Sequence, residues 1–160
     1  MPPPTLIDLS QIDFARVLYD RAQIYQILPQ RFEFALLDGI VHLDPASGDV
    51  VGFREVRADE WWCRGHMPAK ALFPGVLMVE SAAQLAAFGS HFVMNDPSTF
   101  MGFGGIDGAK FRDSVTPPAR LVLVCKAVEI RRRRIICDSQ GFVDGRMVFE
   151  GRITGLKLSW

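Results

Sequence analysis

Residues 65–84 read GHMPAKALFPGVLMVESAAQ, and this stretch decides how the rest of the chain is organised. An apolar run begins at the step from Pro74 to Gly75 and continues to about Met94. A run of this length predicts one long helix that is buried on most sides, and Asn95-Asp96-Pro97 is expected to end it. The first expectation is therefore a single helix at the centre of the fold.

Two polar side chains within this predicted helix define a candidate acid/base site. Glu80 and Gln84 are four residues apart and share one helical face. A carboxylate among apolar residues is costly unless it is paired or has a function. His66 precedes the helix on a proline-rich loop, and a free imidazole titrates near neutrality, at about 6.5. The amide of Gly75 is not shielded by a side chain, and we expect it to hydrogen-bond a carbonyl oxygen.

The amino-terminal part predicts helix. Apolar residues recur with near-helical spacing from Ser10 to about Leu28, which favours one helix or two short ones. Ser10 or Asp13 is expected to cap the start, and Pro29 to end the run. We interpret residues 1–23 as an extension that precedes the main part of a single domain covering the whole chain.

The remaining segments predict an antiparallel sheet. They are rich in β-branched and aromatic residues, and turn residues separate them, with Asp144-Gly145 as the clearest hairpin signal. One buried helix among several strands is typical of an α+β fold in which the sheet wraps around the helix. The predicted strands cover residues 34–43, 50–56, 61–63, 100–111, 121–130, 135–142 and 147–158.

Composition excludes several classes of protein. The 160 residues are 49% apolar, which fits one compact domain, and 18 basic residues balance 18 acidic ones, so no net charge attracts nucleic acid. Polar residues within the apolar run argue against a membrane span, and the start of the chain lacks the pattern of a secretory signal. Cys63, Cys125 and Cys137 have no metal-ligand spacing, so we expect reduced thiols, no metal and a cytoplasmic location.

The motif resembles that of the β-hydroxyacyl-acyl carrier protein dehydratases of fatty-acid synthesis, which have the hotdog fold. Glu80 is typical of the general dehydratase branch, because the dehydratase/isomerase branch has aspartate there. The resemblance extends over residues 27–40 and 105–121. The family pattern of His-x-Pro, Pro-Gly-Val-Leu, Glu and Gln is met at His66, Pro68, Pro74, Gly75, Val76, Leu77, Glu80 and Gln84.

The resemblance implies a role for each of these residues. His66 would remove the C2 proton of a (3R)-3-hydroxyacyl thioester, and Glu80 from the other subunit would protonate the departing hydroxyl. The Gly75 amide would polarise the thioester carbonyl, and Gln84 would orient Glu80 or a water. The resemblance also implies no cofactor, an acyl carrier protein as partner, and a homodimer or a hexamer built as a trimer of dimers.

Departures from the family pattern concern the substrate and its carrier more than the chemistry. Ala69-Lys70-Ala71 replaces Gly-Arg-Pro, and Pro118-Ala119 stands where Pro-Gly-Asp is usual. Met67 replaces phenylalanine, and Gln30 and Phe32 replace a common histidine and tyrosine. Candidates for lining an acyl tunnel, with ordinary core packing as the alternative, are Phe73, Phe88, Phe92, Met101 and Phe103.

Basic residues offer candidate contacts for an acidic carrier. Arg131 to Arg134 form a basic run, but alternate residues of a strand point to opposite faces, so a solvated strand end is an equal alternative. Lys70, Lys110 and Arg112 are the other candidates. Two rival functions stay open at this point: another hotdog acyl-thioester enzyme, such as an enoyl hydratase or thioesterase, and a non-catalytic acyl-binding or regulatory module.

Overall fold

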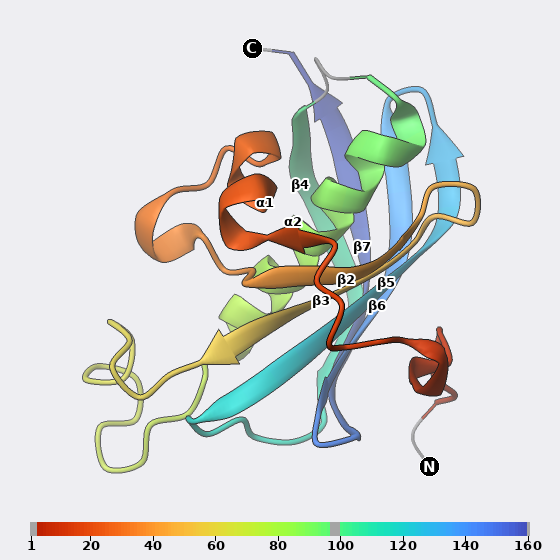
Figure 1. The fold of residues 1–160 in the computed structure, drawn as a ribbon. Coiled ribbons are helices and arrows are strands. Elements are labelled where there is room, and N and C mark those ends of the chain that lie inside the picture. Colours follow the sequence, from red (N-terminus) through yellow and green to blue (C-terminus); the bar gives the residue numbers. More distant parts are fainter. Residues whose placement is uncertain (1–2, 97–99, 160) are drawn as a thin grey trace.

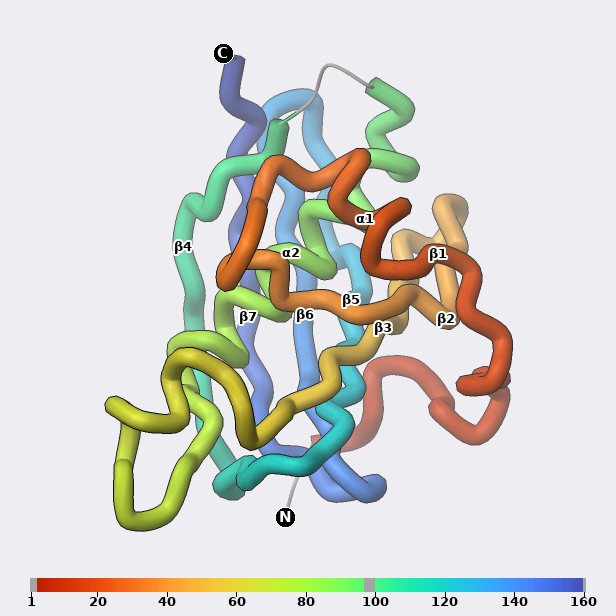
Figure 2. The backbone as a smooth tube through the Cα atoms, turned by 60° about the vertical axis from the view of Figure 1, so that its left-hand side comes forward, coloured from red at the N-terminus to blue at the C-terminus, as the bar shows by residue number. Residues whose placement is uncertain are grey.

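One long helix crosses one face of a seven-stranded antiparallel sheet in the computed structural model, which describes residues 3–96 and 100–159 (Figure 1). The helix is α2, Gly75–Met94, and the strand order is β1-β2-β3-β5-β6-β7-β4. Figure 2 shows the strands curving around α2, which is the arrangement of a hotdog fold. The strands are β1 Tyr19–Asp20, β2 Gly39–Asp44, β3 Asp49–Val56, β4 Phe100–Phe111, β5 Ala119–Arg131, β6 Arg134–Val143 and β7 Arg146–Leu158.

The predicted central helix is confirmed. Ala82, Leu85 and Phe88 of α2 have no exposed surface, because the sheet packs closely against them. Gly52 of β3 permits this close approach, since a Cβ atom there would lie 3.0 Å from Cδ1 of Leu85. The helix ends at Asn95, whose φ of 45° is left-handed, as is common after a last helical turn. Pro97, which was also expected to end the helix, lies outside the described residues.

Within the described residues, α2 is the one helix long and apolar enough to cross a membrane. That property is weak support for a span, because a buried core helix passes the same test. The sheet wraps around α2 and buries 56% of its most apolar window, so the helix has the position of a core helix.

Five of the predicted strands are confirmed to within about two residues, namely those that became β3, β4, β5, β6 and β7. Asp144 and Gly145 form the two-residue turn between β6 and β7, with φ values of 48° and 75°. Two positive φ values are typical of the turn type that matches the twist of paired strands. The alternating residues and the turn signals therefore predicted these five strands correctly.

The strand predicted over residues 34–43 is wrong in its first half, because β2 begins only at Gly39. A short 3-10 helix, η2 (Phe32–Phe34), occupies the start of that segment. The amides of Leu36 and Leu37 donate to side chains, Oε1 of Gln84 and the hydroxyl of Tyr25, instead of to a neighbouring strand.

The strand predicted over residues 61–63 is also wrong. This segment is a series of turns, in which the amides of Cys63 and His66 donate to the carbonyls of Glu60 and Trp62. Trp62 is buried and packs against Phe73, with ring centroids 5.4 Å apart. The short apolar run around Trp62 resembles a strand in sequence, but its aromatic side chain is buried from a turn.

The amino-terminal helical prediction resolves into two short elements, η1 (Leu9–Gln11) and α1 (Arg21–Ile27). Asp20, rather than Ser10 or Asp13, caps α1, since it accepts a hydrogen bond from the amide of Gln23 while the Gln23 side chain accepts one from the amide of Asp20. The helix ends at Ile27, two residues before Pro29, as that proline predicted.

Residues 3–18 pack against the face of the sheet opposite α2. Gln140 of β6 holds this segment by donating to the carbonyl of Pro4 and accepting from the amide of Leu6. Side chains alternate between the two faces of a strand, which places a second apolar cluster on this outer face. The cluster consists of Val41, Val51, Phe53, Val124 and Phe142, covered by Leu6, Ile7, Leu9, Ile12 and Phe14.

Candidate active site

His66 lies on the loop between β3 and α2, and one hydrogen bond fixes its ring. Nδ1 is 2.8 Å from the carbonyl oxygen of Leu72. A carbonyl oxygen only accepts hydrogen bonds, so Nδ1 carries the proton in this contact. In the neutral ring Nε2 then has a free lone pair, which is the state required of a general base.

Buried contacts anchor both ends of the loop that carries His66. Glu60 forms an ion pair with Arg54 of β3, and both side chains are almost fully buried. Phe73 is buried at the other end, where its amide donates to the carbonyl of Val115 at 2.7 Å. Met67, next to His66, has a left-handed φ of 58°, an uncommon conformation for a residue with a side chain. The histidine is therefore held by its surroundings rather than free in solvent.

The amide of Gly75 lies at the first position of α2, where no helical carbonyl precedes it as an acceptor. The first amides that turn back into the helix are those of Leu77 and Met78, which both donate to the carbonyl of Pro74. The ring of Phe111 from β4 covers Gly75 closely, since a Cβ atom at Gly75 would lie 2.8 Å from Cε1 of Phe111. Because glycine has no side chain, the ring of Phe111 can lie close to the free amide of Gly75.

Gln84 holds Glu80 in place. Nε2 of Gln84 donates to Oε1 of Glu80 and to the carbonyl of Phe34, both at 2.8 Å. Oε1 of Gln84 accepts from the hydroxyl of Tyr25 at 2.7 Å and from the amide of Leu36 at 3.2 Å. The buried amide group therefore uses both donors and both lone pairs, which fixes its orientation and that of the carboxylate next to it.

Tyr25 of α1 is a residue of this network that the sequence did not single out. Its hydroxyl bridges Gln84 and the amide of Leu37, at 2.7 and 2.8 Å. Burial raises the pKa of Tyr25 to about 12, so the hydroxyl keeps its proton at neutral pH and donates it. The one available signal was a tyrosine between Ile24 and Ile27, because the hydroxyl of a buried tyrosine usually has a partner.

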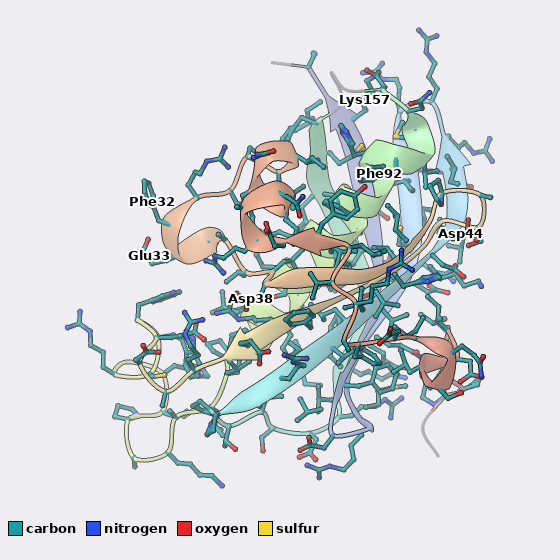
Figure 3. The ribbon with its side chains drawn as sticks, in the orientation of Figure 1. Phe32, Glu33, Asp38, Asp44, Phe92 and Lys157 are labelled. Carbon is teal, nitrogen blue, oxygen red and sulfur yellow. The ribbon has the colours of Figure 1, made fainter. Side chains whose placement is uncertain are left out.

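An apolar cavity of about 80 Å³ extends from Glu80 and Gln84 into the space between α2 and the sheet. Met101 and Phe103 of β4 line it, and their role in an acyl tunnel stays a prediction. Phe73 and Phe88 do not line this cavity: Phe73 packs on Trp62, and Phe88 on Tyr19 and Phe92. Figure 3 shows Phe92 on α2, where it belongs to this aromatic packing and is also absent from the cavity lining.

Cys137 also lines the cavity. Burial raises the pKa of the Cys137 thiol to about 12, so the thiol is neutral at pH 7 and is a poor nucleophile. The cavity thus offers a carboxyl group and an amide to a substrate, but no thiolate. Among residues 3–96 and 100–159, no group of three His, Cys, Asp or Glu side chains has the arrangement of a metal site.

Most of the candidate carrier contacts are already paired. Lys110 and Arg112 both form ion pairs with Glu150. At the turn between β5 and β6, Arg131 and Arg134 both pair with Glu129, while Arg132 and Arg133 line a surface groove with Lys157. Lys70 is exposed on the same loop as His66.

The structure brings Glu80 and Gln84 together but gives His66 a separate position. Within the described part of the chain, no hydrogen bond or ion pair joins His66 to Glu80; His66 contacts Leu72, and Glu80 contacts Gln84. The candidate site consists of an imidazole on an anchored loop, the Gly75 amide at the helix start, and an oriented carboxyl group beside an apolar cavity. Such groups suit proton transfer next to a carbonyl group.

Comparison with known proteins places this geometry in a family. The family described as FabA-like domain matches residues 28–152. The chain is 37% identical to a 3-hydroxyacyl-[acyl-carrier-protein] dehydratase FabZ of Campylobacter jejuni, over 87% of this chain and 97% of that protein. It is 31% identical to the FabZ dehydratase of Desulfotalea psychrophila, over 84% of this chain and 90% of that protein.

Solved structures support the fold. The dehydratase heterocomplex ApeI:P from Xenorhabdus doucetiae matches with a TM-score of 0.73 and 14% identity, over 85% of this chain and 91% of that one. A thioesterase variant from Pseudomonas aeruginosa matches with a TM-score of 0.68 and 18% identity, over 91% and 98%. With the family match and two relatives above 30% identity, the chain belongs to the FabA-like family, in which its relatives are named 3-hydroxyacyl-[acyl-carrier-protein] dehydratases.

Proposed function

We propose that this protein removes water from a (3R)-3-hydroxyacyl group on acyl carrier protein, giving the trans-2-enoyl thioester of fatty-acid synthesis. The observation that carries this proposal is the pair of fixed groups, a histidine with Nε2 free and a carboxyl group oriented at an apolar cavity. The names of the relatives support the same reaction.

In the proposed reaction the proton and the hydroxyl leave from adjacent carbons. Nε2 of His66 takes the proton from C2, and the Gly75 amide hydrogen-bonds the thioester oxygen on which negative charge develops. The C3–O bond breaks as Glu80 gives its proton to the departing hydroxyl, which leaves as water. The cycle closes when the proton on His66 is lost and Glu80 regains one, so the sum of the reaction is dehydration alone.

We propose further that His66 and Glu80 meet across a homodimer. Strand β4 lies at the edge of the sheet and pairs with β7 on one side only, among the residues that the structure describes. Phe103 and Phe111 of β4 are each about half exposed, at 51% and 52%, and Val76 at the start of α2 is 73% exposed. A twelve-residue edge with apolar side chains favours pairing with a second copy. A hexamer built from three such dimers is compatible with this edge.

The carrier is proposed on chemical grounds. Acyl carrier protein is acidic, and the exposed Lys70 lies four residues from His66 on the same loop. The exposed Arg132 and Arg133 are the other candidates, whereas Lys157 in the same groove forms an ion pair with Asp96. We place the reaction in the cytoplasm, where the three free cysteines remain reduced.

Incubation with 3-hydroxyacyl-carrier substrates tests the reaction. We expect the 2-enoyl product by mass spectrometry, whereas release of a free acid would identify a thioesterase, and acyl binding without turnover a binding module. His66→Ala and Glu80→Gln should each remove most activity. His42→Ala on β2 and Glu33→Gln, which points into solvent in Figure 3, are matched controls that should retain it.

Mixing the two inactive variants tests the shared site. When His66→Ala and Glu80→Gln chains are refolded together, random pairing should restore roughly a quarter of wild-type activity, because half of the dimers then hold one intact site of two. Heterodimers that form but remain inactive would show that both groups act within one chain.

A further inference from the structure

Gln30 stands at the junction, here called the constriction, between the cavity beside Glu80 and a neighbouring one. Beyond this point lies a second cavity of about 20 Å³, lined by the end of α1, His91 and residues of β4. The two cavities share four lining residues, namely Gln30, Ala87, Phe100 and Met101. Gln30 comes from the segment after α1, whereas Phe100 and Met101 come from β4.

The order of residues along α2 gives the direction of this channel. Glu80 and Gln84 line the first cavity, Ala87 lies at the constriction, and His91 lines the second cavity. With a rise of about 1.5 Å per residue, Ala87 lies about 10 Å along the helix from Glu80. An acyl chain whose reacting carbons lie beside Glu80 would therefore point its methyl end at Gln30.

Gln30 is both fixed and polar at this apolar position. The guanidinium of Arg31 donates to the carbonyls of Leu28 and Gln30, at 2.8 Å each, which fixes the backbone. Oε1 of Gln30 is buried and has no hydrogen-bond partner within the described residues. A buried amide oxygen without a partner is unfavourable, and an apolar chain that reaches it supplies no hydrogen-bond donor.

We propose that the side chain of Gln30 terminates the acyl channel and thereby sets the longest acyl chain that this enzyme accepts. The proposal rests on the proposed function, since it concerns the substrate of that reaction. The volume of the Gln30 side chain at the constriction sets the length limit. Its unpaired oxygen also makes the end of the channel unfavourable for the methyl end of an acyl chain.

Activity over a series of acyl chain lengths tests this proposal. Gln30→Ala should join the two cavities, so that the longest chain turned over efficiently increases by about two carbons or more. For those longer substrates kcat/KM should increase about tenfold, while short substrates change by less than about twofold. Gln26→Ala, an exposed glutamine of α1, is the matched control and should leave the length profile unchanged.

A variant of similar size separates volume from polarity. Gln30→Leu keeps the channel closed but removes the unpaired oxygen, so the length limit should stay and KM for the longest accepted substrate should decrease. Met101→Ala opens the same constriction from β4 and should extend the limit as Gln30→Ala does. It serves as the second test if Gln30→Ala is poorly folded.

The outcomes distinguish this proposal from the function on which it rests. If the wild type gives no enoyl product from any substrate, the proposed function is wrong. If the wild type is active and a folded Gln30→Ala has the wild-type length profile, Gln30 does not terminate the channel. If Gln30→Leu extends the limit as far as Gln30→Ala, side-chain volume is not the cause and the proposal is also overturned.

Discussion

The hydroxyl of Tyr25 lies 2.7 Å from Oε1 of Gln84, and this contact joins α1 to the carboxyl group of the candidate site. Gln84 in turn donates a hydrogen bond to Oε1 of Glu80, at 2.8 Å. Tyr25 is 59 residues from Gln84 in sequence. The short helix α1 therefore supports the orientation of the Glu80 carboxyl group on α2.

Removing the hydroxyl of Tyr25 should impair catalysis more than binding. Tyr25→Phe leaves a lone pair of Gln84 and the amide of Leu37 without their partner, which we expect to cost about 1–3 kcal/mol of unfolding free energy. A less well oriented Glu80 should lower kcat by roughly ten- to a hundredfold, with little change in KM. Steady-state kinetics and urea unfolding measure the two effects. Tyr19→Phe is the control, because Tyr19 packs on Phe88, and an equal loss of kcat there would contradict the assignment.

The raised pKa of Tyr25 predicts a loss of stability at alkaline pH. Below pH 10 both the folded and the unfolded chain keep this proton, so ionisation of Tyr25 does not lower the free energy of unfolding. Between pH 10 and about 12 the unfolded chain loses the proton while the folded chain retains it, and the free energy of unfolding falls by about 2–3 kcal/mol. Urea unfolding at several pH values measures the slope. Tyr25→Phe should show a smaller decrease over this window, and an identical slope would contradict the shift.

A side chain at Gly75 should displace the ring of Phe111. Gly75→Ala places a Cβ atom about 2.8 Å from Cε1 of Phe111, and the strain should cost about 1–3 kcal/mol of stability together with much of the activity. The backbone amide itself remains, so the double variant Gly75→Ala/Phe111→Leu should recover activity relative to Gly75→Ala. Phe111→Leu alone is the control. Failure of the double variant to recover would mean that the alanine disturbs the amide directly.

Removing residues 1–17 should expose the outer apolar cluster of the sheet. We expect the unfolding free energy to decrease by about 2–4 kcal/mol, since several partly buried apolar side chains are lost with the segment. The truncated protein should also self-associate, as measured by light scattering. Gln140→Leu removes the two hydrogen bonds to Pro4 and Leu6 but keeps the covering side chains, so it should have the smaller effect. Unchanged stability on truncation would show that the segment does not support the fold.

The sequence predicts the elements that form from local pattern and fails where distant side chains intervene. The helix α2 and the β6–β7 hairpin have their signals within the element, so both were predicted closely. The segment before β2 has a strand-like pattern. The amides of Leu36 and Leu37 nevertheless donate hydrogen bonds to the side chains of Gln84 and Tyr25 instead of to a neighbouring strand. Those acceptors are 48 and 12 residues away, beyond the range of any local pattern.

The candidate site follows the same rule. The loop histidine, the free amide and the Glu80–Gln84 pair lie within one twenty-residue motif, so they were found together, although their roles remain predictions. Tyr25 and the constriction at Gln30 depend on how α1 packs against α2, which the sequence does not reveal. An apolar pattern does not distinguish a cavity lining from a core, since Phe73 and Phe88 are buried core residues whereas Phe103 lines the cavity.

The amino-terminal segment limits how copies of this chain can associate. Because residues Leu6 to Phe14 cover the apolar cluster on the outer face, that cluster is not available for two sheets to pack back to back. The open hydrogen-bonding edge of β4 lies elsewhere on the molecule. We therefore expect two copies of this chain to associate edge to edge, in the plane of the sheet, rather than through their outer faces.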